Sequence, residues 1–413
     1  MFKVSPGRRA ELNRLLASWE PDGAGPDALG FGAVETLHFA SVTIFEREFL
    51  DPLLAIECNF DGKLDTFLAD FAAKAGGLFA LLNCRLGPAV RTPREAAEAL
   101  RAAVVRPSAR HIGALGLSRK EILASEALVG AVREHLCAHQ TDLSQLDAPA
   151  VAATLQQAFK ASCPPLAPRR TLPETIAAIM PLAVVAVGIP AVLLWACFAF
   201  ESPWPLAGPL LAVAVAAAVV LWSERREPVR KRPEAGDDLG ARKENRPGAA
   251  QNHFSSLAPL KTGPVRWASR LVFMWLLDQL ARVVFTKGKL GEIPSIHFAH
   301  WAVVDQGSSL VFFSNYGGTW ESYLDDFIQK AANGLTGVWS HCQGFPASRW
   351  LVGGGARDER AFKQYARDTQ AAEALWFSAY PTLTARRINN NRAIVEALAG
   401  QSREPPARWL ARI

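Results

Sequence analysis

Closely spaced cysteines are missing from this chain. Its six cysteines are scattered and none belongs to a CxxC motif: Cys58, Cys84, Cys137, Cys163, Cys197 and Cys342. This spacing excludes a zinc ribbon and a thioredoxin-type redox site and favours a reducing compartment. The GxSxG, HExxH and EF-hand patterns are missing too, and the glycines at 353–355 have neither GxGxxG spacing nor a Walker lysine. The sequence therefore assigns no residue to catalysis and predicts no metal site.

A strong excess of one charge is also missing. Lys plus Arg number 45 and Asp plus Glu number 39, which leaves a net charge of +6 and argues against a nucleic-acid partner. With 413 residues, 50% hydrophobic and 20% charged, the chain can bury one large core or two ordinary ones. Residues 1–30 contain no apolar run typical of a secretory signal, and we expect an N-terminal helical segment there, with a surface helix at 8–19.

Two long uncharged stretches occupy the middle of the chain, at 175–200 and 206–222. About 20 apolar residues span a bilayer core, so residues 171–223 predict a transmembrane helical hairpin in the lipid bilayer. Pro181 and Pro190 should kink the first helix, which membrane helices tolerate. A helical hairpin buried in a soluble core is the alternative, but the length of the uncharged stretches and their basic flanks favour the membrane.

Basic residues flank this hairpin on both sides. They are Arg169 and Arg170 before it, and Arg225, Arg226, Arg230, Lys231 and Arg232 after it. Because positive charge stays on the cytoplasmic side, we expect a multi-pass protein of the bacterial inner membrane with both termini in the cytoplasm. The first part of residues 224–260 is rich in charged residues, Gly and Pro. This composition predicts that residues 224–260 form a flexible linker.

Short motifs recur in the same order before and after the hairpin. LHFA at 37–40 returns as IHFA at 296–299, NFDG at 59–62 as NYGG at 315–318, and FLADF at 67–71 as YLDDF at 323–327. Three weaker matches follow in order, at 77–78 and 334–335, at 84–88 and 342–346, and at 116–122 and 382–388. Collinear matches with small offsets indicate an internal repeat, with copies at 31–165 and 291–413.

The second copy has the pattern of an α+β unit. Alternation predicts strands at 295–305, 309–315, 335–341, 350–353 and 373–380, and helical periodicity predicts helices at 319–331, 356–367 and 384–398. Strands and helices from 309 to 380 follow the order βαββαβ of the ferredoxin-like fold. We therefore predict an α+β fold in which two ferredoxin-like repeats pair within one chain around an inserted hairpin. Residues 261–290 contain an amphipathic helix, at 265–285, that lies either on the membrane or on a sheet.

The motifs carry a resemblance to known proteins. The set IHFAxW, SNYxG, YLDDF and HCxGFP resembles an uncharacterised bacterial family of membrane-anchored proteins, and the architecture resembles the dimeric α+β barrel superfamily. The resemblance covers 31–137 and 293–398. That superfamily includes haem enzymes, monooxygenases and ligand-binding modules, so the resemblance leaves the activity open. The chain departs from the family pattern at His300, where Arg is expected, and at Gly317, where Asp is expected, whereas Asp61 keeps the acid in the first copy.

Histidines are the main candidates for binding. His38 and His297 occupy equivalent positions in the two copies and are either structural residues or ligands. His297 and His300 lie three residues apart on one strand, so their side chains should point to opposite faces and should not share an ion. His341 is expected to lower the pKa of the adjacent Cys342 thiol, unless Cys342 is an inert buried residue. The cofactor that the resemblance allows is haem, with an axial ligand among these four histidines.

Polar residues at strand-to-helix junctions form a second group of candidates. Asn59 and Asp61 in the first copy and Asn315 in the second are either helix caps or parts of an anion site at a helix N-terminus. Arg349 completes the set of candidate ligand-binding residues.

Three functions are compatible with these features. The first is a non-catalytic or sensory module whose paired sheets enclose an apolar or amphipathic small molecule taken from the membrane. The second is a membrane-associated oxidoreductase, haem-dependent, of the dimeric α+β barrel type. The third is a tethered scaffold that recruits other proteins. The missing catalytic motifs favour the first.

Overall fold

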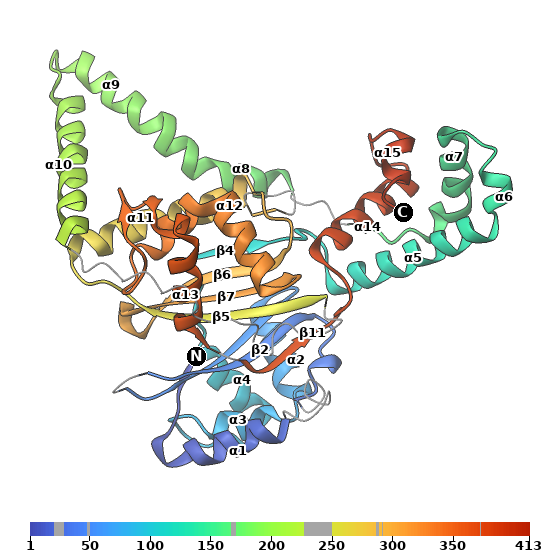
Figure 1. Cartoon of the computed structure of the whole chain (residues 1–413), viewed down its shortest axis with the longest axis horizontal. Coiled ribbons are helices and arrows are strands. Elements are labelled where there is room, and N and C mark those ends of the chain that lie inside the picture. Colours follow the sequence, from blue (N-terminus) through green and yellow to red (C-terminus); the bar gives the residue numbers. More distant parts are fainter. Residues whose placement is uncertain are drawn as a thin grey trace.

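The computed structural model describes residues 1–19, 29–47, 50–166, 171–226, 250–285, 289–290, 292–371 and 373–413. The basic residues at 169–170 and 230–232 and most of the predicted linker lie outside these residues. Figure 1 shows two stacked sheets with helices on their outer sides, a helical arm to one side and long apolar helices at the top. The architecture is mixed α+β with antiparallel sheets, as the sequence predicts at this level.

The first sheet has the strand order β1-β3-β2-β11. Its strands are β1 (Phe2–Lys3), β2 (Leu37–Phe45), β3 (Leu53–Phe60) and β11 (Glu373–Ser378). Four helices cover its outer face: α1 (Arg9–Trp19), α2 (Leu64–Lys74), α3 (Leu78–Asn83) and α4 (Pro93–Ala102). Alternate side chains of the strands, such as Leu37 and Val42, meet Leu12, Phe71 and other apolar residues of these helices in one core.

The second sheet has the order β10-β5-β7-β6-β4. Its strands are β4 (Ala109–Ile112), β5 (Gln251–Pro259), β6 (Ile296–Val304), β7 (Ser309–Gly317) and β10 (Gln370–Ala371). The helices α11 (Pro264–Val283), α12 (Trp320–Trp339) and α13 (Glu359–Thr369) cover its outer face. Met274, Tyr323 and Phe362, one from each helix, pack with Trp301 and Phe312 of the strands.

Each sheet contains one strand from the other half of the chain. β11 pairs with β2, and β4 pairs with β6. The pairing registers of the two halves correspond: Phe39 lies opposite Asn59 as Phe298 lies opposite Asn315, and both ladders shift by one residue just before this pair. This shift places a bulge at each histidine of the recurring HFA motif, at 38 and 297.

The inner faces of the two sheets pack against each other. Phe45, Leu53 and Ala55 of the first sheet form one cluster with Val311 and Phe313 of the second, together with neighbouring apolar side chains. A hydrogen bond between Thr43 Oγ1 and Ser255 Oγ, 3.2 Å long, also crosses the interface. The space between the sheets is therefore enclosed by protein on two sides.

A helical arm extends from one end of the sheets (Figure 1). It consists of α5 (Arg119–Ala138), α6 (Gln140–Leu143), α7 (Ala148–Phe159), α14 (Ala385–Leu398) and α15 (Pro406–Leu410). All of these helices except α6 share one apolar cluster. Ser118 and Glu121 form a capping box that begins α5, and Thr384 caps α14 in the same way without the reciprocal acid. Helices from both halves of the chain thus build the arm together.

Two consecutive helices are long and apolar enough to cross a membrane: residues 172–199 and residues 204–226. The first is α8 (Leu172–Ala183), a π-helical turn (Val184–Gly188) and α9 (Ile189–Ala199), and the second is α10 (Trp204–Arg226). Almost none of their side chains is buried. The π turn lies between Pro181 and Pro190, where the sequence predicts kinks, because a proline removes an N–H and forces the helix to widen locally.

Three predictions about the chain outside the apolar helices are wrong. Residues 335–341 are not a strand, because α12 continues to Trp339 and Gly337 lets the Phe273 ring of α11 approach: a Cβ there would be 2.7 Å from that ring. Residues 350–353 form the turn between the short strands β8 (Ser348–Arg349) and β9 (Gly353–Gly354). Residues 251–259, predicted as linker, are the mostly buried strand β5, since two neighbouring strands hydrogen-bond to them.

Candidate functional site

A cavity of about 480 Å³ lies between the two sheets and along the open edge of β3. β1 pairs only with Leu53 and Leu54, and residues 55–60 line the cavity consecutively. Most of the lining is apolar and includes Ile56, Ala302, Val311, Phe298 and Phe313. The polar lining includes Glu57, Asn59, His300, Arg106 and Arg110. Apolar walls with a few convergent polar groups are typical of small-molecule sites.

Glu57 is the buried acid of this cavity. Its Oε1 accepts hydrogen bonds from the side-chain amides of Asn59 and Asn315, the latter at 3.3 Å. Its Oε2 is 3.5 Å from Ser41 Oγ, at the limit of a hydrogen bond. Burial raises the pKa of Glu57 to about 8, although the bonds from Asn59, Asn315 and Ser41 lower it in part. The carboxyl group therefore holds a proton at neutral pH.

The orientation of Asn315 follows from its other neighbours. Trp376 Nε1 can only donate, and it lies 2.8 Å from Asn315 Oδ1. This oxygen also accepts from His253 Nδ1 at 3.0 Å, so His253 Nε2 carries no proton and accepts from Ser255 Oγ at 2.8 Å. Burial lowers the pKa of His253 to about 3, so its ring stays neutral. The amide nitrogen of Asn315 is thereby held toward Glu57.

The proton of Glu57 can be placed from these bonds. Oε1 already accepts from two amide groups, so the proton belongs on Oε2. Only the long contact to Ser41 competes for it. Glu57 is thus an O–H donor in the wall of the cavity, with a long contact between its Oε2 and Ser41 Oγ. A ligand oxygen that accepts from this O–H in place of Ser41 would gain a better hydrogen bond.

His300 faces the same cavity. Its Nδ1 lies 4.0 Å from Glu57 Oε1, its ring packs on Phe313 with centroids 5.4 Å apart, and its side chain keeps 22% exposure. Burial and, to a smaller degree, the charge of Arg110 lower the pKa of His300 to about 4. With a neutral imidazole beside a protonated carboxyl group, the charge in the cavity lining comes from the exposed Arg106 and Arg110. Arg110, which is exposed, lies opposite His300 in the β4–β6 ladder.

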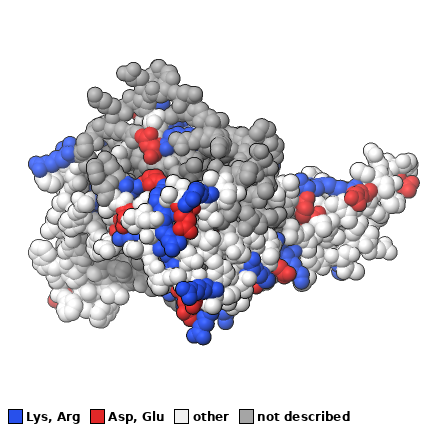
Figure 2. Space-filling model, turned by 90° about the horizontal axis from the view of Figure 1, so that it is seen from below, with Lys and Arg blue, Asp and Glu red and all other residues white. Residues whose placement is uncertain are grey.

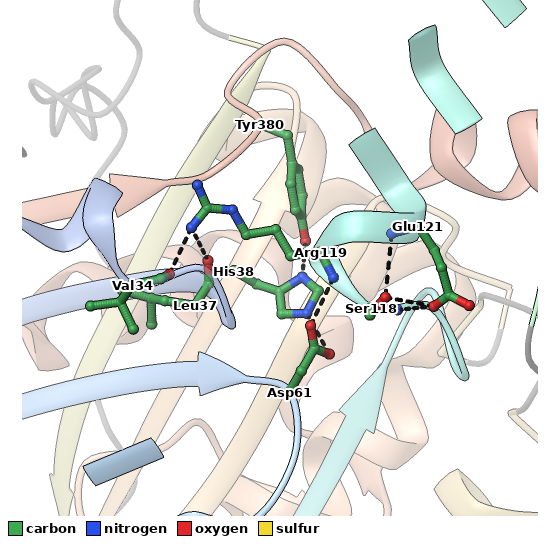
Figure 3. Close-up of polar contacts among 8 residues, drawn as sticks. All are labelled: Val34, Leu37, His38, Asp61, Ser118, Arg119, Glu121 and Tyr380. Atoms are coloured by element: carbon green, nitrogen blue, oxygen red, sulfur yellow. Dashed lines mark hydrogen bonds and ion pairs between the residues drawn. The ribbon is translucent and has the colours of Figure 1, made fainter. Parts of the chain in front are cut away.

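A second polar cluster lies at the bulge of β2 (Figure 3). Asp61 Oδ1 accepts from His38 Nε2 at 2.9 Å, so His38 Nδ1 accepts from the Tyr380 hydroxyl at 2.8 Å. Asp61 Oδ2 accepts from the backbone N–H of Arg119, the first residue of α5, at 2.8 Å. Burial and the charge of Asp61 raise the pKa of Tyr380 well above its usual value, so the phenol stays protonated.

This cluster acts as a connection between segments. The Arg119 guanidinium donates to the carbonyls of Val34 and Leu37, which precede the bulge (Figure 3). His38 and Tyr380 are almost fully buried, with exposures of 2% and 3%, and both ring nitrogens of His38 are occupied. The hydrogen bonds among Asp61, His38 and Tyr380 therefore join β2, α5 and the segment after β11. They leave no nitrogen of His38 to bind a ligand.

The equivalent position in the second half has lost these partners. Gly317 replaces the acid, and Ala114 occupies the place of Tyr380, because Gly113 and Ala379 donate equivalent backbone bonds to the carbonyls of His297 and His38. A Cβ at Gly317 would lie 3.4 Å from the Ala250 carbonyl oxygen and from Thr384 Cγ2. Among the described residues, His297 Nε2 is buried without a hydrogen-bond partner.

The predicted site residues thus fall into separate places. Asn59, His300 and Asn315 meet at Glu57, and His38 and Asp61 meet at the β2 bulge. His297 packs on Phe39 with ring centroids 5.2 Å apart and is absent from the cavity lining, so it and His300 lie in different surroundings. Arg349 is exposed in β8. Only the first group surrounds a cavity.

His341 and Cys342 do not behave as predicted. Burial and the charges of Arg266, Lys261 and Arg270 lower the pKa of His341 to about 3, so its ring is neutral and cannot stabilise a thiolate. Burial raises the pKa of the Cys342 thiol to about 12. Cys342 is fully buried and matches the inert alternative.

The four histidines can be tested against the haem ligand that the resemblance implies. His38 uses both ring nitrogens in hydrogen bonds, and neither His297 nor His341 lines the cavity between the sheets. His300 is the one of the four that does. The expectation of an axial ligand therefore reduces to this residue, whose Nδ1 faces Glu57.

Sequence reasoning missed Glu57 and His253. For Glu57 the sequence did contain a signal, because Glu57 is the only charged residue in the strand LLAIECNF and the remaining residues of this strand predict burial. His253 lies in the segment that composition assigned to a linker, so no pattern singled it out. Comparison of the chain with protein-family models, with curated proteins and with solved structures found no match.

Proposed function

We propose that this protein is a membrane-attached binding protein that takes up an apolar molecule with an uncharged oxygen acceptor, such as a quinone or ketone, in the cavity between its sheets. The observation that carries the proposal is the Glu57 carboxyl group, which burial keeps protonated at neutral pH and which lines a mostly apolar cavity. Its O–H would donate to the ligand oxygen, and the walls formed by Phe298, Val311 and Phe313 would contact the rest of the molecule.

The acceptor is expected to be uncharged. A ligand carboxylate would lose its hydration among the apolar walls, and burial disfavours the charged imidazolium of His300 that could pair with it. A carbonyl or hydroxyl oxygen loses much less on entry and gains one hydrogen bond.

Membrane attachment is supported by the two apolar helices. In the proposal they form a hairpin across the bacterial inner membrane, and the basic residues on both flanks keep both termini and both sheets in the cytoplasm. An apolar ligand dissolved in the bilayer would then reach the cavity without crossing a large volume of water. A reporter fused after Ile413 would be active on the cytoplasmic side, and activity on the opposite side would contradict this topology.

The fold supports a duplicated unit. Counted from β1 and from β5, each half follows the order βαββαβ once its last strand, β4 or β11, is included and the two-residue strands β8, β9 and β10 are left out. In this proposal two ferredoxin-like copies have exchanged their last strands, and the matching registers of β2–β3 and β6–β7 support it. The two sheets then enclose the ligand as an intramolecular pair similar to a dimeric α+β barrel.

The binding experiment compares ligand content between variants. The protein is purified in detergent, and its organic extract is analysed by mass spectrometry. We expect an oxygen-containing apolar molecule in the wild type and in Glu98→Gln, an exposed control, and several-fold less in Ala302→Phe, which fills the cavity. Equal amounts in Ala302→Phe, or none in the wild type, would overturn the proposal.

The role of the Glu57 proton is tested with a defined probe. Equilibrium dialysis of 1,4-naphthoquinone should show binding that weakens about tenfold as pH rises through the Glu57 pKa of about 8. Glu57→Gln keeps a donor and should bind with no such pH dependence. The absorption spectrum of the same samples tests the oxidoreductase alternative: a Soret band that is lost in His300→Ala would favour it over simple binding.

A further inference from the structure

The helix α11 has its polar and apolar faces reversed relative to a surface helix of a soluble protein. Arg266 and Arg270 are buried, at 4% and 6% exposure. Trp267 and Val272 on the other face are exposed, at 58% and 61%. In water, an amphipathic helix turns its apolar stripe to the core and its charges to the solvent. The medium that contacts the outer face of α11 is therefore expected to be apolar.

Contacts with the rest of the protein hold α11 in this orientation. Its N-terminal half places Arg270 over the β6–β7 turn, where the Arg270 guanidinium donates to the Gly307 carbonyl at 3.2 Å. On the same side, Phe273 packs on the bare backbone of α12 at Gly337. Met274 joins the core of the second sheet. The helix cannot rotate about its axis to bury the outer face without breaking all of these contacts.

The exposed residues form one continuous stripe. Steps of four or five along the helix connect Trp267, Leu271, Val272, Trp275 and Leu276, and each of these side chains is at least 36% exposed. Two of the five are tryptophans, which prefer the boundary between lipid headgroups and acyl chains. None of these five side chains is charged, and the ion pair of Asp278 and Arg282 follows them on the same side of the helix.

This stripe is continuous with the two apolar helices. α8 and α10 both contact α11, at the base of the triangle that Figure 1 shows between α9, α10 and the second sheet. Glu224 near the end of α10 fixes this arrangement, since its carboxylate accepts from Ser348 Oγ at 2.7 Å and from the backbone N–H groups of Trp350 and Leu351 at 2.8 Å. The outer side of α11 thus lies toward the helices that pass the criteria for crossing a membrane.

The opposite side of the molecule has the surface expected in water. Figure 2 shows Lys and Arg next to Asp and Glu over the described part of the face that is remote from α9 and α10. Ion pairs there include Arg101 with Asp65 and Lys74 with Asp70. The absence of charge on the α11 stripe is therefore a local property and not a property of the whole surface.

We propose that the exposed stripe of α11 is a membrane-docking surface that lies in the bilayer at the boundary between headgroups and acyl chains, parallel to the membrane plane. It would seat the second sheet against the bilayer at the base of the apolar helices. The proposal rests on membrane attachment by those helices and adds a third membrane element to it. The partner is the lipid bilayer itself, and α11 carries too many charged side chains along its length to cross it.

The test uses fluorescent probes at single cysteines in the full-length protein, reconstituted into phosphatidylcholine–phosphatidylglycerol vesicles. The six native cysteines are replaced first, and this background must keep the wild-type melting temperature. Probes are placed at Leu271→Cys in the stripe, at Val213→Cys in α10, and at Leu146→Cys after α6. Leu146, at 44% exposure, matches Leu271, at 47%, but lies in the helical arm. Brominated acyl chains quench probes in lipid, and aqueous iodide quenches probes in water.

We expect at least twofold quenching by brominated lipid at positions 271 and 213 and little at 146, with the reverse order for iodide. Quenching by brominated lipid at 213 but not at 271 would overturn the docking surface and leave membrane attachment intact. No such quenching at 213 would contradict membrane attachment itself. Shielding of position 271 from both quenchers would mean that protein covers the stripe, and this outcome would also overturn the proposal.

Discussion

The two halves of the molecule share a backbone pattern but differ in the chemistry that they place on it. In the first half, the bulged histidine, His38, has an acid and a phenol as partners, and the inner face carries Glu57. In the second half, the equivalent histidine, His297, lacks a partner for Nε2 among the described residues, and Phe313 occupies the position that corresponds to Glu57. The comparison shows that the first half supplies the acid of the candidate site, whereas the second half supplies an amide and an imidazole beside it.

Amide groups from both halves nevertheless meet at one atom. Asn59 and Asn315 are equivalent in register, and both donate to Glu57 Oε1. A single acid, placed on one side of a nearly symmetric pair of sheets, thereby receives a symmetric pair of donors. The candidate site depends on the contact between the halves and would not exist in either half alone.

The largest expected effect is the loss of pH dependence in Glu57→Gln. The folded protein binds this proton up to a pKa of about 8, whereas the usual value is 4.5. The contribution of Glu57 to the free energy of unfolding should therefore fall as pH rises between these values, by on the order of 5 kcal/mol, and stay level above pH 8. The buried histidines with lowered pKa values act in the opposite direction below about pH 6.5, so the wild type is compared with Glu57→Gln by thermal melting in detergent from pH 5 to 9. The difference between the two profiles should show the Glu57 contribution, and identical profiles would refute the assigned pKa.

Removal of the acid at the first bulge should have the next largest effect. In Asp61→Ala, His38 Nε2 and the Arg119 N–H lose their acceptor inside the protein, which costs about 2–4 kcal/mol of unfolding free energy. The α5 start should loosen as well, visible as faster amide hydrogen exchange in the first turn of the helix. Glu98→Gln serves as the exposed control, and a loss no greater than in that control would show that the cluster is not a connection.

The opposite result is expected at the second bulge. His297→Phe removes a buried nitrogen that has no partner among the described residues and keeps an aromatic ring against Phe39. The variant should be as stable as the wild type or more stable by up to about 1 kcal/mol. A loss of more than 1 kcal/mol in urea titrations would indicate that His297 has a role that its surroundings do not show.

The smallest effects should be equal in the two halves. Ser118→Ala and Thr384→Ala each remove the N-cap of equivalent helices, α5 and α14, and each should lower stability by about 1 kcal/mol. The melting temperatures of both variants measure this. Unequal losses would mean that the helical arm depends on one half more than on the other, contrary to the shared core of α5 and α14.

Local sequence patterns predicted much of the fold. Strands β6 and β7, helices α11 and α14, and the two apolar helices lie within a few residues of their predicted bounds. These elements have a strong period or a long uniform composition, which neighbouring residues impose on the backbone. Where the run was short and apolar, as at 335–341, the pattern did not distinguish a strand from the end of a helix, and the contact with Phe273 decided.

The candidate site was predicted only in part. Asn59, His300 and Asn315 were singled out one by one, but no pattern indicated that they converge on Glu57, which is remote from two of them along the chain. The β5 strand was missed because its sequence, QNHFSSLAP, is polar where it faces the other sheet. A polar side chain that is buried by a second sheet looks like a solvated one when only its neighbours in sequence are considered.

The sequence alone determined which segments are apolar helices, which strands recur in the two halves, and which histidines lie on them, because each depends on residues close together in the chain. Only the tertiary structure decided the exchange of β4 and β11, the environment of Glu57 and the outward turn of the α11 apolar face. These depend on contacts between residues far apart in the chain. Burial, and with it the charge state of a carboxyl group, is a property of the assembled surfaces and not of the strand that carries the residue.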